Sequence, residues 1–277
     1  MERISATVLD DSAGALAPEV ALRPDLAGMR IFGAPLFGVA RADDPLFEAL
    51  RREEAVGPWH MLPGDVCPGA KSVLSVFLPY IERIKASNAG GAEPSAEWLH
   101  GRIEGHKFMV RAAGAAVEAL RAAGHRAALP MADGRFFAQE GATTDPAAFP
   151  GVPEAARGAY TSNWSERHVA YVCGLGTFGL SKGLITEKGA CGRFFSLVTD
   201  LEMAPTPRAY GGIYDHCIRC GRCAARCPAG AIDTESGKAH PPCGAKLVET
   251  RGKYAPRYGC GKCLCGVPCE GRDPSRE

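Results

Sequence analysis

Two patterns of hydrophobic and polar positions recur along the first part of the chain, one typical of strands and one typical of helices. The apolar run KSVLSVFLPY, over residues 71–80, is typical of a buried strand that ends at a proline. PLFGVAR predicts a shorter strand, and Asp44 and Pro45 after it form a helix start that puts Phe47 and Leu50 on one face. RAALP and GRFFSLVTDLEM predict further strands.

The longest periodic segment is AEWLHGRIEGHKFMVRAAGAAVEALRAAGH, which predicts a long helix. Its buried face is predicted from the spacing of Val110, Ala113, Val117 and Leu120. Gly124 is a natural end for this helix because glycine adopts left-handed backbone angles. Since strands and helices alternate, residues 1–204 are predicted to form one α/β domain, in an α/β or α+β arrangement.

Near residue 204 the composition changes to Pro and Gly, and then to Cys. The chain has 12 cysteines in 277 residues, and most of them lie between Cys217 and Cys269. The residues beyond 204 are too few to build a large apolar core, so bound metal is expected to organise them. We therefore predict a second domain over residues 205–277.

Composition and charge narrow the class of protein. A net charge of +1 predicts no attraction to nucleic acid or to a membrane surface. The first residues lack the basic and apolar regions of a signal peptide, and no apolar run approaches the roughly 18 residues that span a bilayer. The expected location is the cytoplasm, where thiols stay reduced, and this argues against a disulfide framework.

The first dense cysteine motif is CIRCGRCAARCP, with the spacing C-x2-C-x2-C-x3-C-P. Zinc sites favour two CxxC pairs separated by a dozen or more residues, whereas this run matches bacterial ferredoxins. It predicts that Cys217, Cys220 and Cys223 bind one [4Fe-4S] cluster, and that Cys227 binds a second one.

A second motif supplies the remaining thiols: Cys243, Cys260, Cys263, Cys265 and Cys269. In a two-cluster ferredoxin the two motifs exchange their fourth ligands. Cys269 is therefore expected on the first cluster, while Cys243, Cys260 and Cys263 join Cys227 on the second. Cys265 lies inside the longer gap of this motif and is an alternative to Cys269 or Cys263. Two [4Fe-4S] clusters are predicted in a ferredoxin-like domain.

Three glycines, Gly174, Gly176 and Gly179, form G-x-G-x-x-G. A dinucleotide fingerprint should follow a strand and open a helix, but residues 165–172 look more helical than strand-like. The motif is open to three interpretations: a nicotinamide site, a structural turn that needs positive φ, or close approach of a large flat cofactor to exposed backbone.

Several segments in a fixed order carry a resemblance to a known family. SERHVAYVC followed by GLGTFGLSKGLIT, LPGDVCPGAKSVLSVFLPY upstream and the CxxCxxCxxxCP run downstream resemble epoxyqueuosine reductases and, more distantly, reductive dehalogenases. The resemblance covers residues 35–269. It implies a nitroreductase-like α/β domain that binds a base-off corrinoid (cobalamin), with the two clusters delivering electrons to its cobalt.

The resemblance also implies a set of corrinoid contacts. The glycine loop would pack near the ring, and nearby polar side chains would hydrogen-bond to its amides. The predicted contacts are Asn163, Trp164, Ser165, Gly174, Leu175, Gly176, Thr177, Phe178, Gly179 and Ser181.

Tyr160 is the predicted proton donor. Epoxyqueuosine reductases place an aspartate six positions before the pair that corresponds here to Glu166 and Arg167, and this chain has Tyr160 there. Reductive dehalogenases resemble this in using a tyrosine. The chain is shorter than full-length epoxyqueuosine reductases and has no basic surface signal, so a small-molecule substrate is expected and tRNA is not.

Two functions from different classes remain open at this point. One is a corrinoid-dependent iron–sulfur reductase supplied by a low-potential donor of the ferredoxin or flavodoxin type. The other is an electron-transfer or corrinoid-handling accessory without substrate chemistry of its own. Cys67, Cys173 and Cys191 are expected to be small buried hydrophobes. His216, which precedes the first ligand cysteine, is expected in a solvated loop, with hydrogen bonding beside the first cluster as the alternative.

Overall fold

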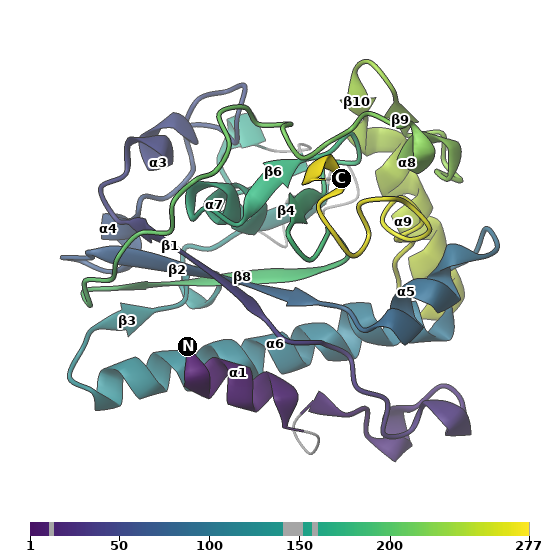
Figure 1. Cartoon of the computed structure of the whole chain (residues 1–277), viewed down its shortest axis with the longest axis horizontal. Helices are drawn as coiled ribbons and strands as arrows, with labels where there is room; N and C mark the ends of the chain where they lie inside the picture. Colours follow the sequence, from purple (N-terminus) through teal and green to yellow (C-terminus); the bar gives the residue numbers. More distant parts are fainter. Residues whose placement is uncertain (11–13, 141–151, 157–159, 277) are drawn as a thin grey trace.

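The computed structural model describes residues 1–10, 14–140, 152–156 and 160–276 of the chain (Figure 1). Its centre is an antiparallel sheet with strand order β1-β2-β8-β3. The strands are β1 (Leu36–Arg41), β2 (Ser72–Pro79), β8 (Gly192–Thr199) and β3 (Ala127–Ala128). β2 pairs with β8 along its whole length, from Ser72 opposite Thr199 to Pro79 opposite Gly192. The predicted α+β class is confirmed, and every strand pair in this sheet is antiparallel.

Helices cover both faces of the sheet (Figure 1). One face carries α1 (Glu2–Leu9) and α6 (Ala96–Ala122), and the other carries α3 (Pro45–Ala49), α4 (Pro63–Val66) and α7 (Glu166–Val172). The Asp44 side chain accepts a hydrogen bond from the Leu46 amide, so the predicted start of α3 is confirmed. None of the helices in the described ranges has the length and apolar character needed to cross a bilayer.

The buried face of α6 differs from the predicted one at a single position. Ala113 and Val117 are buried as expected, but Val110 is 40% exposed. The helix turns Phe108 and Met109 toward the core instead, and its alanines allow close approach to β8. Gly124, with φ +86°, follows the helix as predicted.

Two short hairpins and a cysteine-rich part complete the chain. The hairpins pair β4 (Ala138–Glu140) with β5 (Tyr160–Ser162), and β6 (Gly176–Phe178) with β7 (Leu184–Thr186). The cysteine-rich part contains α8 (Arg222–Ala225), β9 (Ile232–Asp233), β10 (Gly237–Lys238) and α9 (His240–Tyr254). In Figure 1 it lies beside α5 (Glu82–Ala89).

The cysteine-rich part packs directly on α5 and α6. Lys262 is buried, and its Nζ donates to the carbonyl oxygens of Asn88 and Gly90 at 3.1 and 2.6 Å. Cys265 belongs to the same hydrophobic core as Trp98 of α6. Gly261 has φ +68°, and a Cβ there would meet the Trp98 ring at 1.9 Å, so this contact requires glycine. The two parts thus share one core, and the boundary near residue 204 stays a prediction.

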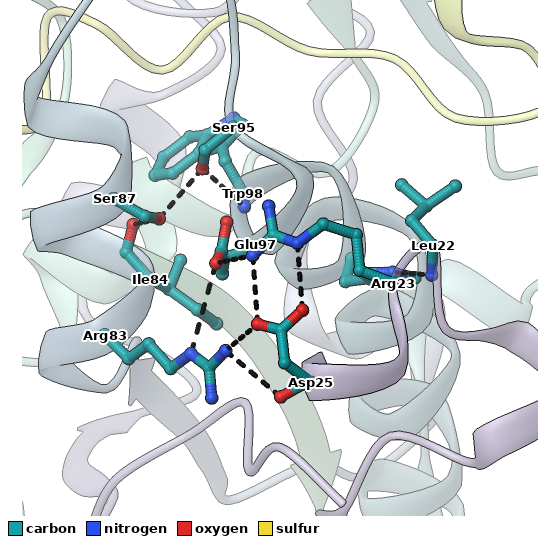
Figure 2. Close-up of polar contacts among 10 residues, drawn as sticks. Leu22, Arg23, Asp25, Arg83, Ile84, Ser87, Ser95, Glu97 and Trp98 are labelled. Atoms are coloured by element: carbon teal, nitrogen blue, oxygen red, sulfur yellow. Dashed lines mark hydrogen bonds and ion pairs between the residues drawn. The ribbon is translucent and has the colours of Figure 1, made fainter. Parts of the chain in front are cut away.

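An ion-pair network fixes the segment before β1 (Figure 2). Glu97 lies in the first turn of α6 with its side chain 7% exposed, and it accepts a 2.7 Å contact from Arg23. Arg83 of α5 pairs with Asp25 at 2.6 Å. An acidic side chain in a first helical turn is also favoured by the helix dipole. The network therefore holds the 3-10 turn Pro24–Leu26 against both helices.

Candidate functional site

Four cysteines from both motifs line one hollow. Cys217, Cys220 and Cys223 come from the loop before α8 and from α8 itself, and Cys269 comes from the last loop. Burial raises the pKa of Cys269 to about 12, and the neighbouring thiols of the other three add to that rise. The structure therefore brings together the four residues that the spacing predicted for the first cluster.

The other four predicted cysteines form a second group. Burial is the main cause that raises the pKa of Cys263 to about 12, Lys238 acts in the opposite direction, and nearby thiols raise it further. Those thiols are Cys260, Cys243 and Cys227. Cys227, from the first motif, thus lies among the cysteines of the second, and Cys269 lies among those of the first.

The donor chemistry of these groups suits iron–sulfur clusters. Thiolates are soft ligands, and in a cubane cluster each thiolate binds a different iron. A zinc site would instead require four ligands that converge on one ion. Within the described part of the chain, no three His, Cys, Asp or Glu side chains converge closely enough to hold a single metal ion. The two groups of thiols fit clusters better than single ions.

Cys265 is turned away from both groups. Its Sγ lies 3.7 Å from the Sγ of Cys191, and the amide of Asn88 donates to it at 3.7 Å. Both sulfurs are buried in the core. The geometry therefore places Cys269, and not Cys265, beside Cys217, Cys220 and Cys223.

The glycine segment forms a turn and a tight hairpin after α7. Gly174 has φ +83° and begins the turn, while a Cβ on Gly176 would lie 2.0 Å from the Ile185 carbonyl oxygen of β7. A Cβ on Gly179 would lie 3.8 Å from the Cys217 Sγ. The hairpin therefore packs against the first group of thiols. Because a helix precedes the motif, the dinucleotide interpretation fails.

Three of the predicted corrinoid contacts form hydrogen bonds inside the protein. The Asn163 side chain accepts from the Phe137 amide at 2.9 Å and donates to the Arg135 carbonyl at 2.8 Å. The Trp164 ring is buried, and its Nε1 donates to the Ser196 hydroxyl. The Thr177 hydroxyl accepts from the His216 amide at 2.8 Å. These side chains hold the loops around the glycine segment in place.

The remaining predicted contacts divide between two hollows and the loop interior. Ser165 lies 2.7 Å from the His168 ring, and Phe178 packs on that ring. Ser181 and Gly179 line the hollow of the first thiol group. Gly174 and Leu175 line a second cavity of about 220 Å³, together with Leu36, Phe37, Thr206, Pro207, Tyr210 and His216. That these residues hold a corrinoid stays a prediction.

Tyr160 lies at the surface on β5 and is 38% exposed. Its ring lies almost parallel to that of His240, with centroids 4.2 Å apart and an interplanar angle of 7°. The Nε2 of His240 lies 3.2 Å from the Lys182 Nζ. The predicted proton donor therefore sits beside a histidine and a lysine that come from distant parts of the chain.

The sequence did not show that two further groups are buried. The Glu166 carboxyl is buried and accepts a 2.7 Å hydrogen bond from Ser196, and burial raises its pKa to about 8. His216 is buried, and its Nδ1 donates to the Ile185 carbonyl at 2.8 Å, so the expectation of a solvated loop was wrong. Both roles depend on contacts across long sequence separations, which the local pattern does not encode.

Comparisons with known sequences match only part of the chain. A 4Fe-4S binding domain model matches residues 212–233, which contain the first cysteine motif. Over 68 residues, 24% of the chain, the sequence is 41% identical to a tetrachloroethene reductive dehalogenase from Desulfitobacterium hafniense, and the match covers 12% of that protein. An enzyme with the same description from Dehalobacter restrictus matches to the same extent.

Solved structures extend the likeness to most of the chain. A catabolic reductive dehalogenase superposes with a TM-score of 0.54 at 16% identity, over 87% of this chain and 31% of that one. An epoxyqueuosine reductase from Bacillus subtilis superposes with a TM-score of 0.52 at 18% identity, over 86% of this chain and 62% of that one. This chain has the fold of these reductases. The resemblance to epoxyqueuosine reductases and reductive dehalogenases is confirmed, and the chain spans less than two thirds of either relative.

Proposed function

We propose that this chain is a corrinoid-dependent iron–sulfur reductase of a small molecule. The observation that carries the proposal is the pair of thiol groups with exchanged fourth members, set on a fold shared with two kinds of reductase. A reductive dehalogenase of this fold carries out B12-dependent dehalogenation, which supports the choice of cofactor. Clusters of this kind carry single electrons at low potential.

In this proposal each group of thiols holds one [4Fe-4S] cluster. Cys217, Cys220, Cys223 and Cys269 hold the first, and Cys227, Cys243, Cys260 and Cys263 hold the second. Because the glycine hairpin packs against Cys217, the first cluster would lie beside the loop predicted to contact the corrinoid. The corrinoid supplies the reducing cobalt centre, and the protein supplies binding, orientation and protons.

The proposed place for the corrinoid is the cavity lined by Gly174 and Leu175. Gly174, with φ +83°, is only partly buried and lines this cavity, and Thr206 lies 3.1 Å from where a Cβ would be. The cavity walls combine apolar side chains with polar and charged residues, namely Thr206, Tyr210, His216, Glu187 and Arg276. This mixture of surfaces suits a ring that carries amide side chains.

Metal analysis of anaerobically purified protein, supplied with cobalamin, tests the proposal. We expect about eight irons with matching sulfide and one cobalt per chain, because two [4Fe-4S] clusters and one corrinoid are proposed. Eight irons without cobalt would contradict the reductase. That result would favour an electron-transfer accessory, an alternative supported by the exposure of Cys220 in the first thiol group.

Two serine substitutions separate a ligand from a neighbouring buried thiol. Cys269→Ser is expected to lose about four irons per chain, because its thiol lies with the first group. Cys265→Ser is the matched control, since it changes a cysteine of the same motif that packs against Cys191. Iron and sulfide per chain are measured for both. The assignment is refuted when Cys265→Ser, and not Cys269→Ser, loses a cluster.

Tyr160 is the proposed proton donor of the reaction. A phenol hydroxyl can donate its proton to a strong base formed during reduction. Tyr160→Phe keeps the ring that stacks on His240 and removes only the hydroxyl, so cluster and corrinoid spectra should stay unchanged. Turnover is expected to fall by at least about 100-fold, and turnover equal to that of the wild type would rule Tyr160 out.

An electron donor of the ferredoxin or flavodoxin type is part of the same proposal. The substrate is proposed to be a small molecule and not tRNA, although an epoxyqueuosine reductase of this fold binds an epoxyqueuosine-modified tRNA stem loop. The chain has a net charge of +1, and strong binding to nucleic acid usually relies on an excess of basic residues.

A further inference from the structure

A short turn after the second cysteine motif contacts both hollows of the site. It is the 3-10 turn Pro274–Arg276, and Asp273 directly precedes it. Pro274 lines the hollow of the first thiol group, while Arg276 lines the cavity in which the corrinoid is proposed. The turn therefore lies between the first thiol group and that cavity.

The carboxylate of Asp273 is buried beside this turn, with its side chain 3% exposed. Its Oδ1 accepts hydrogen bonds from the amide and the hydroxyl of Ser275, at 3.0 and 2.7 Å. Its Oδ2 lies 3.1 Å from the Arg276 Nε and 3.5 Å from the His216 Nε2, but accepts no hydrogen bond from any residue in the described ranges. The Arg276 side chain is 61% exposed, so water screens its charge more than that of the carboxylate.

His216 connects this carboxylate to the first thiol group. It directly precedes Cys217 and also lines the cavity. The His216 amide donates to the Thr177 hydroxyl at 2.8 Å, and its Nδ1 donates to the Ile185 carbonyl at 2.8 Å, so the glycine hairpin holds both its backbone and its ring. Asp273 thus contacts the residue next to a cysteine that is expected on the first cluster.

The reduction potential of an iron–sulfur cluster depends on the charge around it. A [4Fe-4S] cluster bound by four thiolates is an anion, and reduction adds further negative charge to it. A fixed negative charge nearby disfavours the added electron and lowers the potential, and this effect is stronger where water is excluded. Arg276 does not abolish the contribution of Asp273, because the electrostatic potentials of separate charges add.

We infer that Asp273 is a positioning residue: its buried carboxylate, held against His216, lowers the reduction potential of the first cluster. The inference rests on the proposed function, because it takes the first thiol group as a cluster site. Asp273 is the fourth residue after Cys269, and it acts on the cluster by its charge without binding iron. A lower potential makes the reduced cluster a stronger reductant, which suits a protein that is proposed to reduce a bound corrinoid.

Potentiometric titration of the anaerobically purified full chain, followed by electron paramagnetic resonance, tests the inference. Asp273→Asn removes the charge at nearly constant size. The equilibrium constant for reduction of the first cluster should rise about 10-fold, which is a shift of about +59 mV for one electron. Cys269→Ser is expected to lack the first cluster, so its spectrum identifies the signal of the second one, whose potential should change less in Asp273→Asn.

Asp215→Asn is the matched control. Asp215 is exposed and lies two residues before Cys217, so its substitution changes the net charge equally near the same cluster. The amides of Gly211 and Gly212 both donate to one oxygen of this side chain, and asparagine keeps an oxygen for them. Because water screens an exposed charge, the shift should be less than half of that in Asp273→Asn. Equal shifts would show a general charge effect and overturn the inference.

Arg276→Met keeps the inference testable if Asp273→Asn loses its iron. Removal of this cation leaves the carboxylate without its nearest positive charge, so the potential of the first cluster should fall. The fall should be smaller than the rise expected for Asp273→Asn, because the Arg276 side chain is largely exposed. A potential that stays the same or rises in Arg276→Met would contradict the role of Asp273.

Iron and cobalt contents separate this inference from the proposed function. About eight irons and one cobalt in the wild type, with an unchanged potential in Asp273→Asn, would refute the role of Asp273 and leave the reductase standing. The expected shift in a protein that binds no corrinoid would keep the role and refute the reductase. A wild type without a first cluster would overturn both.

Discussion

The carboxyl group of Glu166 is buried inside the protein. Its carboxyl receives one hydrogen bond from Ser196, which also accepts from Trp164, while its second oxygen has no partner within the described residues. Burial disfavours the charged form and raises the pKa to about 8. At neutral pH this carboxyl is therefore mostly protonated and acts as a neutral member of the core around Trp164.

This protonation makes the stability of the protein depend on pH. Between the ordinary carboxyl pKa of 4.5 and the raised pKa of about 8, the folded chain keeps a proton that the unfolded chain releases, so stability falls as pH rises. Glu166→Gln removes this dependence because its amide does not titrate. In chemical unfolding at pH 5 to 8, the slope of stability against pH should flatten by at most ~1.4 kcal/mol per pH unit. Equal slopes would mean that Glu166 is charged in the folded protein.

At the scale of single residues, the sequence predicted the cysteines better than the surrounding polar side chains. The spacing of the first cysteine motif matches that of two-cluster ferredoxins, so the groupings, with the exchange of Cys227 and Cys269, followed from that pattern. Asn163 and Thr177 are polar residues near the glycine segment, and the sequence could not show that backbone amides occupy their side chains. His240 reaches Tyr160 only through the fold.

At the scale of elements, the C-terminal end of α5 is held by two cations of the cysteine-rich part. Lys262 donates to the carbonyls of Asn88 and Gly90, and Arg226 donates to that of Ala89 at 2.6 Å. The last carbonyls of a helix have no partner within the helix, and positive charge near them is favourable. Lys262 lies between Cys260 and Cys263, so this cap ties the second thiol group to α5.

Lys262→Met should destabilise the protein by about 2 kcal/mol, because two buried carbonyls lose a charged donor. Thermal unfolding of the purified protein measures the change. Lys71→Met serves as control, since Lys71 is exposed and its 3.6 Å ion pair with Glu202 should contribute at most about 1 kcal/mol. Equal effects of the two substitutions would show that the cap on α5 contributes nothing particular.

Long periodic elements were predictable and short ones were not. α6 and β2 contain enough residues for their periods to be recognised. β3, β9 and β10 have two residues each and no readable period. The antiparallel order β1-β2-β8-β3 joins strands far apart in the chain, and strand order depends on packing that no local pattern records.

At the scale of the whole molecule, a chain of buried polar contacts joins three regions. Arg257, just before Cys260, pairs with Glu104 of α6 at 3.0 Å and donates to the Val20 carbonyl. Glu104 contacts His100, which accepts a hydrogen bond from the Leu22 amide. The segment before β1, the long helix and the cysteine-rich part are therefore fixed to one another, although the sequence predicted two separate domains.

The exchange of Cys227 and Cys269 between the two groups of thiols bears on how the protein is made. A ribosome releases Cys217, Cys220 and Cys223 well before Cys269, and the first group lacks its fourth thiol until then. Neither cluster site can be completed by one motif during synthesis. Delivery of iron and sulfide to the first site is thus postponed until Cys269 has emerged, and a ribosome that stalls before Cys263 yields a product with no complete site.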